Sequence, residues 1–318
     1  MMNEFDIIKN YFTKQSIHRT DVIIGIGDDA AIVKVPPQHE LVVTTDSLLV
    51  DVHFPASTSP ADIAHKALAV NLSDLAAMAA TPAWFTLALT IPNADTIWLS
   101  AFADGLFKLA YRYQIELIGG DLTRGPLSIT IQAMGYIPEQ QAILRSLAKP
   151  GDLIYVTGQL GEAGLALKLL SQKKIGSENL SLLERLNRPE PRIEVGERLR
   201  GIAHAAIDIS DGLAADLGHI LEESHVGAVI YVDKLPFSTT LKHLVSVEEA
   251  IALALNSGDD YELCFTVSSQ KKMEIEKRLS DITCSMTCIG YITQQSGLVC
   301  QYQNGIRYHG TIQGYQHF

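Results

Sequence analysis

The 318-residue chain has few cysteines, and they form neither a disulfide framework nor a zinc-site pattern. Its four cysteines lie in apolar or strand-like surroundings near the end of the sequence, at Cys264, Cys284, Cys288 and Cys300. Cys284 and Cys288 have no second pair of matching spacing that would complete a metal site. We therefore expect reduced thiols in or near a core.

Runs of basic residues and long apolar runs are also absent. The chain carries 36 acidic and 25 basic residues, a formal net charge of −11. Surfaces that bind polyanions are typically basic, so we expect no nucleic-acid partner and no membrane partner. No apolar stretch approaches the ~20 residues that span a bilayer. Acidic residues interrupt the N-terminus early, unlike a signal peptide. We expect a cytoplasmic protein with small-molecule ligands.

Strand-like and helix-like segments alternate along the chain. The clearest helix covers residues 59–82, where Ser59 is a suitable N-cap and Pro60 fills the first helical position. The turn at Lys149–Asp152 precedes a fresh strand and marks a boundary. The pattern predicts two domains of α/β or α+β class, with these bounds: 1–148 and 149–318.

Two further helices and a short N-terminal one are predicted from hydrophobic spacing. Residues 95–114 form an amphipathic pattern, and residues 204–225 read as strand, turn and helix. At the N-terminus Phe5, Ile8, Tyr11 and Phe12 recur at helical spacing, which predicts a short amphipathic helix.

The stretch "DVIIGIGDDAAIV" (21–33) has glycines at the spacing of a dinucleotide-binding turn. Such a turn must open a helix, whose N-terminus then meets the pyrophosphate. Here a short β-like run follows and ends at Pro36-Pro37. The glycine match is therefore accidental, and two aspartates stand where a phosphate would approach.

Acidic residues collect in turns next to glycine. Taken singly, each is most simply a turn or N-cap residue. As a set they have no basic residue beside them in sequence, and clustered carboxylates repel unless cations hold them. Mg²⁺ commonly bridges carboxylates to substrate phosphates, so the set favours a metal-bound phosphate ligand. Asp74 differs from the rest because it interrupts an apolar helix. The turn acids are Asp28, Asp29, Asp46, Asp121, Asp208, Asp211, Asp259, Asp260 and Glu262.

Four other residues offer weaker signals. Thr44 and Thr45, beside Asp46, could give oxygens to a metal. Arg145 could contact phosphate, and a surface arginine on a linker explains it equally well. His53 could contact a ligand, although a lone histidine on a strand is more often structural.

Together the motifs resemble the thiamine-monophosphate kinase family, in order and over nearly the whole chain. They are "GIGDDAAIV", "TTDSLLVDVHF", "KALAVNLSDLAAMAATP", "IGGDLTRGPLSIT", "KPGDLIYVTG", "AIDISDGLAADLGH", "SGDDYELCF" and "GYQHF". The resemblance implies a ferredoxin-like N-terminal sheet domain that dimerises and a C-terminal α/β domain. It also implies Mg²⁺-dependent transfer of a phosphoryl group from ATP to thiamine monophosphate, giving thiamine diphosphate.

The resemblance further implies roles for individual residues. Those that would serve several Mg²⁺ ions are Asp29, Thr44, Thr45, Asp46, Asp74, Asp121, Asp208 and Asp211. Those that would lie at ATP are Gly120, Asp121, Arg145 and Ser210. Those that would contact the thiamine phosphate are His53, Asp259 and Tyr315. Asp259 departs from the family, which often has glutamate there, and this weakens its assignment.

Related families and a non-catalytic alternative fit less well. Selenophosphate synthetase would need a reactive cysteine near the N-terminus, and the first cysteine here is Cys264. The hydrogenase-maturation relative would need a C-terminal cysteine, and aminoimidazole ribonucleotide synthetase has a different glycine-rich motif. A catalytically idle nucleotide-binding regulator stays open, although unused clustered charge would cost stability.

Overall fold

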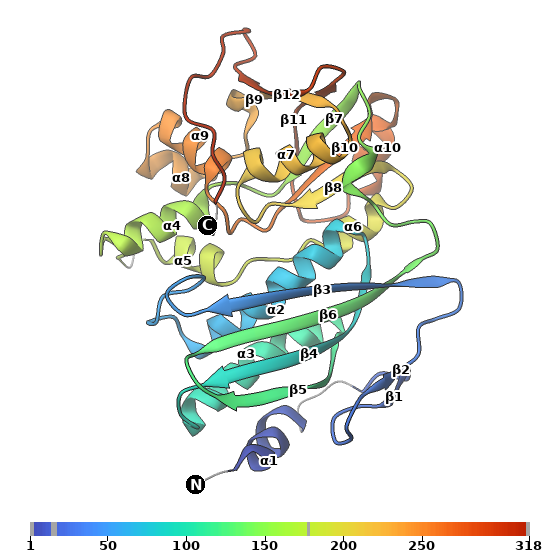
Figure 1. Cartoon of the computed structure of the whole chain (residues 1–318). Coiled ribbons are helices and arrows are strands. Elements are labelled where there is room, and N and C mark those ends of the chain that lie inside the picture. The colour runs from blue at the N-terminus through green and yellow to red at the C-terminus, as the bar shows by residue number, and fades with distance from the viewer. Residues whose placement is uncertain (1–2, 14–17, 177–178, 316–318) are drawn as a thin grey trace. The chain divides into compact units, whose positions relative to one another are not determined.

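The computed structural model describes residues 3–13, 18–176 and 179–315 and divides the chain into two compact units. The first unit comprises residues 1–75 and 80–140, and the second comprises residues 76–79 and 141–318. Both units combine sheets and helices (Figure 1). The predicted class, two domains of mixed α and β structure, is confirmed. No helix in the described part of the chain is long and apolar enough to cross a membrane.

The first unit is built on a four-stranded sheet with the order β3-β6-β4-β5. Strands β3 and β4 run antiparallel to β6, whereas β4 and β5 are parallel. Figure 1 shows helices α2 and α3 behind the strands, on one face of the sheet. The bounds are β3 His39–Leu49, α2 Pro60–Ala77, β4 Thr81–Ile91, α3 Thr96–Tyr113, β5 Glu116–Arg124 and β6 Ser128–Pro138.

Capping chemistry places both helices where the sequence predicts them. Pro60 begins α2, and the Ser59 side chain accepts a hydrogen bond from the Asp62 N–H at 3.2 Å. Asp95 caps α3 through bonds from two backbone N–H groups of its first turn. Proline suits a first helical position because its missing N–H would have no helical partner there. Helix α2 ends at Ala77, five residues before the predicted end at residue 82, and Pro82 lies inside β4.

The N-terminal segment and a small hairpin complete the first unit. Helix α1 (Glu4–Ile7) continues directly into a π-helical turn, η1 (Ile8–Thr13), as the predicted amphipathic segment. Strands β1 (Val22–Ile24) and β2 (Ile32–Val33) form a two-stranded sheet. The hairpin confirms that no crossover helix follows the glycines at residues 25 and 27.

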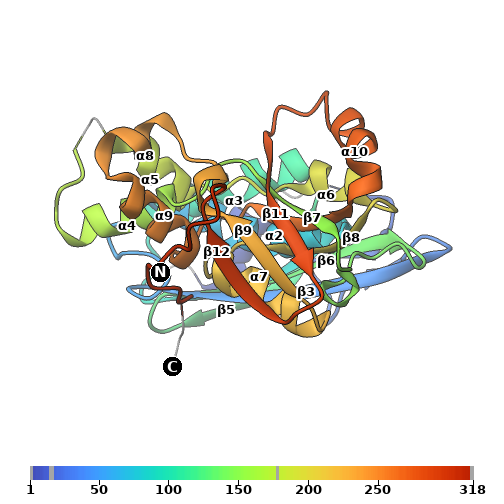
Figure 2. The ribbon, with the colours of Figure 1, turned by 90° about the horizontal axis from the view of Figure 1, so that it is seen from above.

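The second unit is built on a six-stranded mixed sheet with the order β12-β9-β11-β7-β10-β8. Figure 2 shows β12, β9 and β11 side by side. Only the β12–β9 pair is parallel. The strand bounds are β7 Asp152–Thr157, β8 Ala203–Asp208, β9 Gly227–Tyr231, β10 Leu263–Ser268, β11 Met286–Thr293 and β12 Gly297–Gln301.

The helices of the second unit form two hydrophobic clusters. Residues of α7 and α9 pack with the sheet strands in one core, and α4, α5, α8 and α9 supply the other. The helix bounds are α4 Glu162–Ser171, α5 Leu180–Asn187, α6 Ile193–Leu199, α7 Leu213–Glu223, α8 Thr239–Leu244, α9 Val247–Asn256 and α10 Lys272–Arg278. Short 3₁₀ turns lie at η2 Arg145–Leu147, η4 Val232–Lys234 and η5 Ser269–Lys271.

Close strand packing leads to a stability prediction at Gly290 in β11. A Cβ added there would lie 2.0 Å from the Val229 carbonyl oxygen. Gly290→Ala should therefore lower the free energy of unfolding by about 3 kcal/mol, since backbone atoms cannot move aside cheaply. Gly218 on α7 is the matched control, with no atom within 4 Å of an added Cβ. Gly218→Ala should raise stability by about 0.5–1 kcal/mol. Urea unfolding measures both, and equal effects would contradict the packing argument.

Candidate functional site

One group of candidate ligands lies where β3 meets α2. Thr44 and Asp46 pair with Ala133 and Ile131 of β6, both fully buried, so their side chains share the helix-covered face of the sheet. The Thr44 hydroxyl donates a hydrogen bond to the Asp74 carboxylate on α2. The strand and the helix thus bring together three of the predicted metal ligands.

The electrostatics of this group suit a cation. Burial, and then the charge of Asp74, raise the pKa of Asp46 to about 6. One turn before Asp74 on α2, Asn71 is fully buried, and its Oδ1 has no hydrogen-bond partner in the described structure. Two neighbouring carboxylates and a hydroxyl, with an unsatisfied amide oxygen one turn earlier on the same helix, offer oxygen ligands of the kind Mg²⁺ takes. The residues present therefore fit the metal.

Thr45 and His53 lie apart from that group. Thr45 pairs with the exposed Gln132, so its side chain is on the other face of the sheet from Thr44 and Asp46. His53 follows β3, and its Nδ1 accepts the Leu49 N–H at 3.0 Å. In the neutral ring the proton is therefore on Nε2. The buried Lys66 ammonium donates to the His53 carbonyl oxygen at 3.2 Å, which helps to fix this loop.

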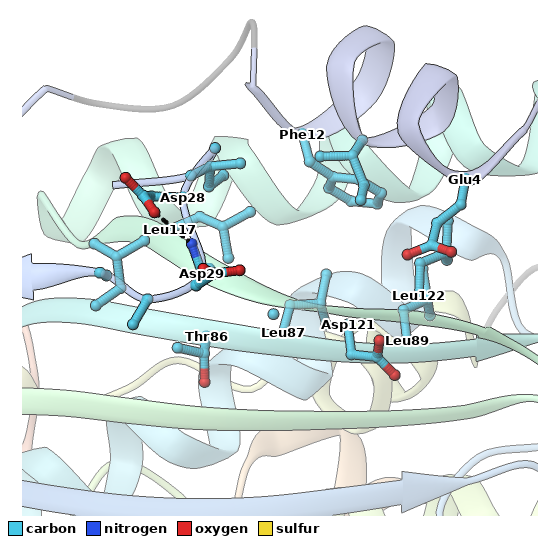
Figure 3. Close-up of a pocket in the computed structure, with 18 of the residues that line it drawn as sticks. Glu4, Phe12, Asp28, Asp29, Thr86, Leu87, Leu89, Leu117, Asp121 and Leu122 are labelled. Carbon is cyan, nitrogen blue, oxygen red and sulfur yellow. Dashed lines mark hydrogen bonds between the residues drawn. The ribbon is translucent and has the colours of Figure 1, made fainter. Parts of the chain in front are cut away.

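A second group surrounds a cavity of about 640 Å³ in the first unit. The loop before β2 supplies Asp28 and Asp29, and β5 supplies Gly120 and Asp121 (Figure 3). The Asp29 N–H donates to Asp28 Oδ1 at 2.8 Å, which orders the acidic turn. Phe5, Ile8 and Phe12 of the N-terminal segment and leucines of β4 and β5 supply the apolar part of the wall, and Glu4 adds a carboxylate.

The sheet order separates the Asp46 group from Asp121. β3 and β5 are opposite edges, with β6 and β4 between them. Three strand spacings of ~4.8 Å put the two aspartates roughly 14 Å apart. Asp121 also pairs with the exposed Ala88, so it lies on the open face of the sheet, whereas Asp46 lies on the covered one. Within one chain a single ion cannot bind both.

A third group lies in the second unit, where two loops pair. The Asp259 N–H donates to the Ser210 carbonyl at 2.9 Å, and the Tyr261 N–H donates to the Ile209 carbonyl at 2.8 Å. A Cβ at Gly258 would lie 1.9 Å from the Ser210 carbonyl oxygen, so this approach requires glycine. The pairing brings the "DISDG" and "GDD" acids together although some 50 residues separate them in sequence.

Asp208 and Tyr315 join this third group, whereas Arg145 does not. Asp208 is buried at the end of β8, and the Tyr315 N–H donates to the Asp211 carbonyl at 3.0 Å. The last three residues of the closing motif, 316–318, lie outside the described part. The Arg145 carbonyl accepts the Ser224 hydroxyl, at the far end of α7 from Ser210. The 11 residues of α7 separate the backbones of Arg145 and Ser210 by roughly 16 Å.

The structure corrects the interpretation of Asp260 and Glu262 as free turn acids. The Glu262 carboxylate is buried and accepts bonds from Arg192 at 2.5 and 2.6 Å and from Arg185 at 2.9 Å. Asp260 accepts the Gly161 N–H, and burial raises its pKa well above the usual value. The basic partners lie 70 and 77 residues away in the chain, so local sequence did not reveal them.

Asp216 is a buried acid whose position the sequence argument did not use. Its Oδ2 accepts the Asp211 N–H at 3.1 Å, which holds the loop that carries Ser210 and Asp211. Burial raises the pKa of Asp216 to about 7. The available signal was an acid between Leu213 and Leu217 on the apolar face of a helix, the same signal that singled out Asp74.

Among the described residues, no three His, Cys, Asp or Glu side chains converge on one metal position. The aspartates instead form the separate pairs and loops described above. Each group could share a metal ion only with oxygens from elsewhere, such as phosphate, water or another chain.

Comparison with known proteins shows the family. Residues 27–137 match "AIR synthase related protein, N-terminal domain", and residues 149–303 match the corresponding C-terminal domain. The chain is 47% identical to thiamine-monophosphate kinase of Haemophilus influenzae over 93% of this chain and 91% of that one. It is 46% identical to the enzyme of Escherichia coli K12 over 99% and 98%. The chain belongs to the thiamine-monophosphate kinase family.

Solved structures agree with this membership. The crystal structure of thiamine-monophosphate kinase from Stenotrophomonas maltophilia is 46% identical, with a TM-score of 0.86 over 92% of this chain and 93% of that one. A structure described as "AaThiL complexed with AMPPCP and TMP" is 30% identical, with a TM-score of 0.76 over 100% and 99%. The relatives are enzymes, and so is this chain.

The buried ion pairs of Glu262 give a prediction that separates structural from exposed acids. Glu262→Gln removes the carboxylate that Arg192 binds and one of the two carboxylates beside Arg185, and should lower the free energy of unfolding by about 3 kcal/mol or more. Glu274 pairs with Arg278 on an exposed helix face and is the matched control. Glu274→Gln should change stability by less than about 0.5 kcal/mol. Urea unfolding of both variants measures this, and equal losses would show that the buried network is not stabilising.

Proposed function

We propose that this protein transfers the γ-phosphoryl group of ATP directly to thiamine monophosphate, giving thiamine diphosphate and ADP. The observation that carries the proposal is the set of carboxylates in three groups at the ends and edges of strands, in a chain of this family. Full-length relatives named for this activity support it, as does the related structure that holds AMPPCP and TMP.

Several Mg²⁺ ions would be held by the residues that the structure groups. Thr44, Asp46 and Asp74 form one ligand set, and Asp29 and Asp121 border the cavity. Asp208 and Asp211 belong to the second unit. Bound there, Mg²⁺ would neutralise phosphate charge that the acidic side chains would otherwise repel.

The reaction requires little from the protein beyond positioning of the two reacting phosphates. The acceptor is a phosphate oxygen that is already ionised near neutral pH, so no general base is required. One P–O bond forms to that oxygen, the bond between the γ-phosphorus and its bridging oxygen breaks, and ADP leaves. Holding the two phosphates in line supplies most of the rate enhancement. This explains why the candidate site is rich in aspartate.

The residues that would contact the substrates also come from both units of the chain. Gly120, Asp121 and Ser210 would lie at the nucleotide, and Arg145 would reach it from η2. His53 would present Nε2–H to the substrate phosphate, because Nδ1 is already occupied by a backbone bond. Asp259 and Tyr315 share one loop cluster and would contact the thiamine moiety, with the half-exposed Tyr315 ring as an aromatic wall.

The protein would act as a homodimer. On the open face of the sheet, β3 exposes Leu41, Val43 and Leu49, which are 48%, 49% and 43% accessible. Large apolar side chains exposed on one strand face favour association. In a symmetric dimer, the β3 edge of one copy could meet the β5 edge of the other. This arrangement would place β3, which carries Asp46, beside β5 of the partner, which carries Asp121, so that one strand spacing would separate the two acids instead of the three within a chain.

A direct assay tests the proposed activity. Purified protein with ATP, Mg²⁺ and thiamine monophosphate should produce ADP and thiamine diphosphate in equal amounts, and EDTA should abolish both products. ATP binding without turnover would instead favour a regulatory protein.

The metal assignment predicts that Asp46→Asn and Asp74→Asn each reduce turnover by at least about a hundredfold, as loss of a charge-stabilising group does. Circular dichroism and thermal unfolding should show that the variants stay folded. Asp104→Asn, an exposed aspartate on α3, is the control and should retain turnover. Near-normal turnover of the first two variants would contradict the assignment.

The shared dimer site predicts complementation between two inactive variants. Asp46→Asn and Asp121→Asn chains should each be inactive alone. After unfolding and refolding together, half the dimers are mixed and have one intact site, so activity should recover to about a quarter of the wild-type value. Refolding each variant alone is the control. No recovery in a mixture shown to contain mixed dimers would contradict a site shared between copies.

A further inference from the structure

We propose that the N-terminal segment Glu4–Thr13 forms the nucleobase-binding wall of the cavity and fixes the affinity for the ATP base. This proposal rests on the proposed function, which supplies a nucleotide as the occupant. It assigns a role to residues outside the acidic motifs, in a segment that neither the sheet nor the helices α2 and α3 include.

The cavity has the two-sided chemistry that a nucleotide requires. Asp28, Asp29 and Asp121 supply acid, where metal-bound phosphates would be held, and Glu4 adds one carboxylate at the start of the N-terminal segment. Phe5, Ile8 and Phe12 of the N-terminal segment, with leucines of β4 and β5, supply an apolar surface. Figure 3 shows Phe12 projecting from the helix towards the strands that carry Leu87 and Leu89. A volume of about 640 Å³ lies in the range of small-molecule sites.

The segment presents apolar side chains beyond those that its own packing needs. Phe12 and Ile7 are buried, at 5% and 4% accessibility, and hold the segment in place. Phe5 also lines the cavity yet is 78% accessible, so its ring gains little from burial within the protein. The backbone changes from α-helix to π-helix at Ile8, and π-helical turns are rare and frequent at functional sites.

Gly119 provides an independent indication that the cavity is kept clear. It lines the cavity, and an added Cβ would meet no atom within 4 Å. Its φ is not in the left-handed region, so neither backbone conformation nor a clash requires glycine there. Its neighbour Gly120 differs, because a Cβ there would lie 1.9 Å from the Leu87 carbonyl oxygen. The glycine at 119 is therefore explained by space for a ligand.

An aromatic and aliphatic wall of this kind suits the flat face of a base. Stacking of a base on an aromatic side chain is sequence-tolerant and strong enough to change affinity about tenfold or more. The expected contributions of the wall are therefore to ATP binding and not to the transfer step.

The test measures binding of a non-hydrolysable ATP analogue and the steady-state constants of the full-length protein. Phe5→Ala and Phe12→Ala should each weaken analogue binding and raise the KM for ATP about tenfold, with kcat and the KM for thiamine monophosphate unchanged. Tyr11→Ala, an aromatic change in the same segment at a residue that does not line the cavity, is the matched control and should bind normally. Because the Phe5 ring is exposed, Phe5→Ala should not unfold the segment, so a loss of binding in this variant reports on the ligand contact.

Two inhibitors separate the base from the phosphates. Inhibition by adenosine, which has no phosphate, should weaken in the Phe5 and Phe12 variants. Inhibition by inorganic triphosphate, which has no base, should not change. Gly119→Val should weaken adenosine inhibition without lowering the melting temperature.

The outcomes distinguish this proposal from the kinase proposal. Wild-type binding of the ATP analogue by both phenylalanine variants would overturn the base wall, whether or not the protein makes thiamine diphosphate. A rise in the KM for thiamine monophosphate alone would also overturn the base wall. An equal weakening of inhibition by inorganic triphosphate in these variants would overturn it as well. Base-dependent binding by a protein that fails to make thiamine diphosphate would support the wall and overturn the proposed function.

Discussion

Electrostatic repulsion among carboxylates is the constraint on which the candidate site depends. The fold places acids at the ends and edges of two sheets, and some of them, such as Asp46, are partly buried. At Asp46, burial and the charge of Asp74 raise the pKa to about 6. A cation or a proton must offset such a group, and a chain of this family would use Mg²⁺ together with phosphate. The site then needs no catalytic base, because metal and positioning would do the chemistry.

The same repulsion is relieved in another way at Glu262. Two arginines bind that carboxylate directly, and a threonine hydroxyl donates a further bond at 2.6 Å. The Glu262 backbone carbonyl accepts the Ile209 N–H. This bond joins Glu262 to the start of the loop that carries Ser210 and Asp211. One short motif, "GDDYE", thus contains both Asp259, which belongs to the loop cluster of Ser210, and two buried acids that hold the protein together. The distinction follows from burial and partners, not from residue type.

The first unit shows how sheet order shapes the functional proposal. Asp46 and Asp121 lie on opposite edges, yet the family resemblance assigns both to metal. A symmetric pair of chains offers a physical resolution, because joining unlike edges would bring the two aspartates together. The exposed apolar face of β3 gives such a pair a reason to form. The N-terminal segment would then complete the cavity with the apolar side chains of Phe5, Ile8 and Phe12.

Local sequence determined much of this protein. Ser59, Pro60 and Asp95 predicted the starts of α2 and α3, because caps and a first-position proline act within a few residues. The prolines after Ala30 excluded a dinucleotide-binding helix, and Asp74 stood out as an acid in an apolar helix. The motifs, in order, identified the family. Tertiary structure alone decided which acids meet: the arginines of Glu262, the pairing of Asp259 with Ser210, and the separation of Arg145 from Ser210. Those contacts join residues far apart in the chain, and their distances depend on strand order and packing, which no local pattern encodes.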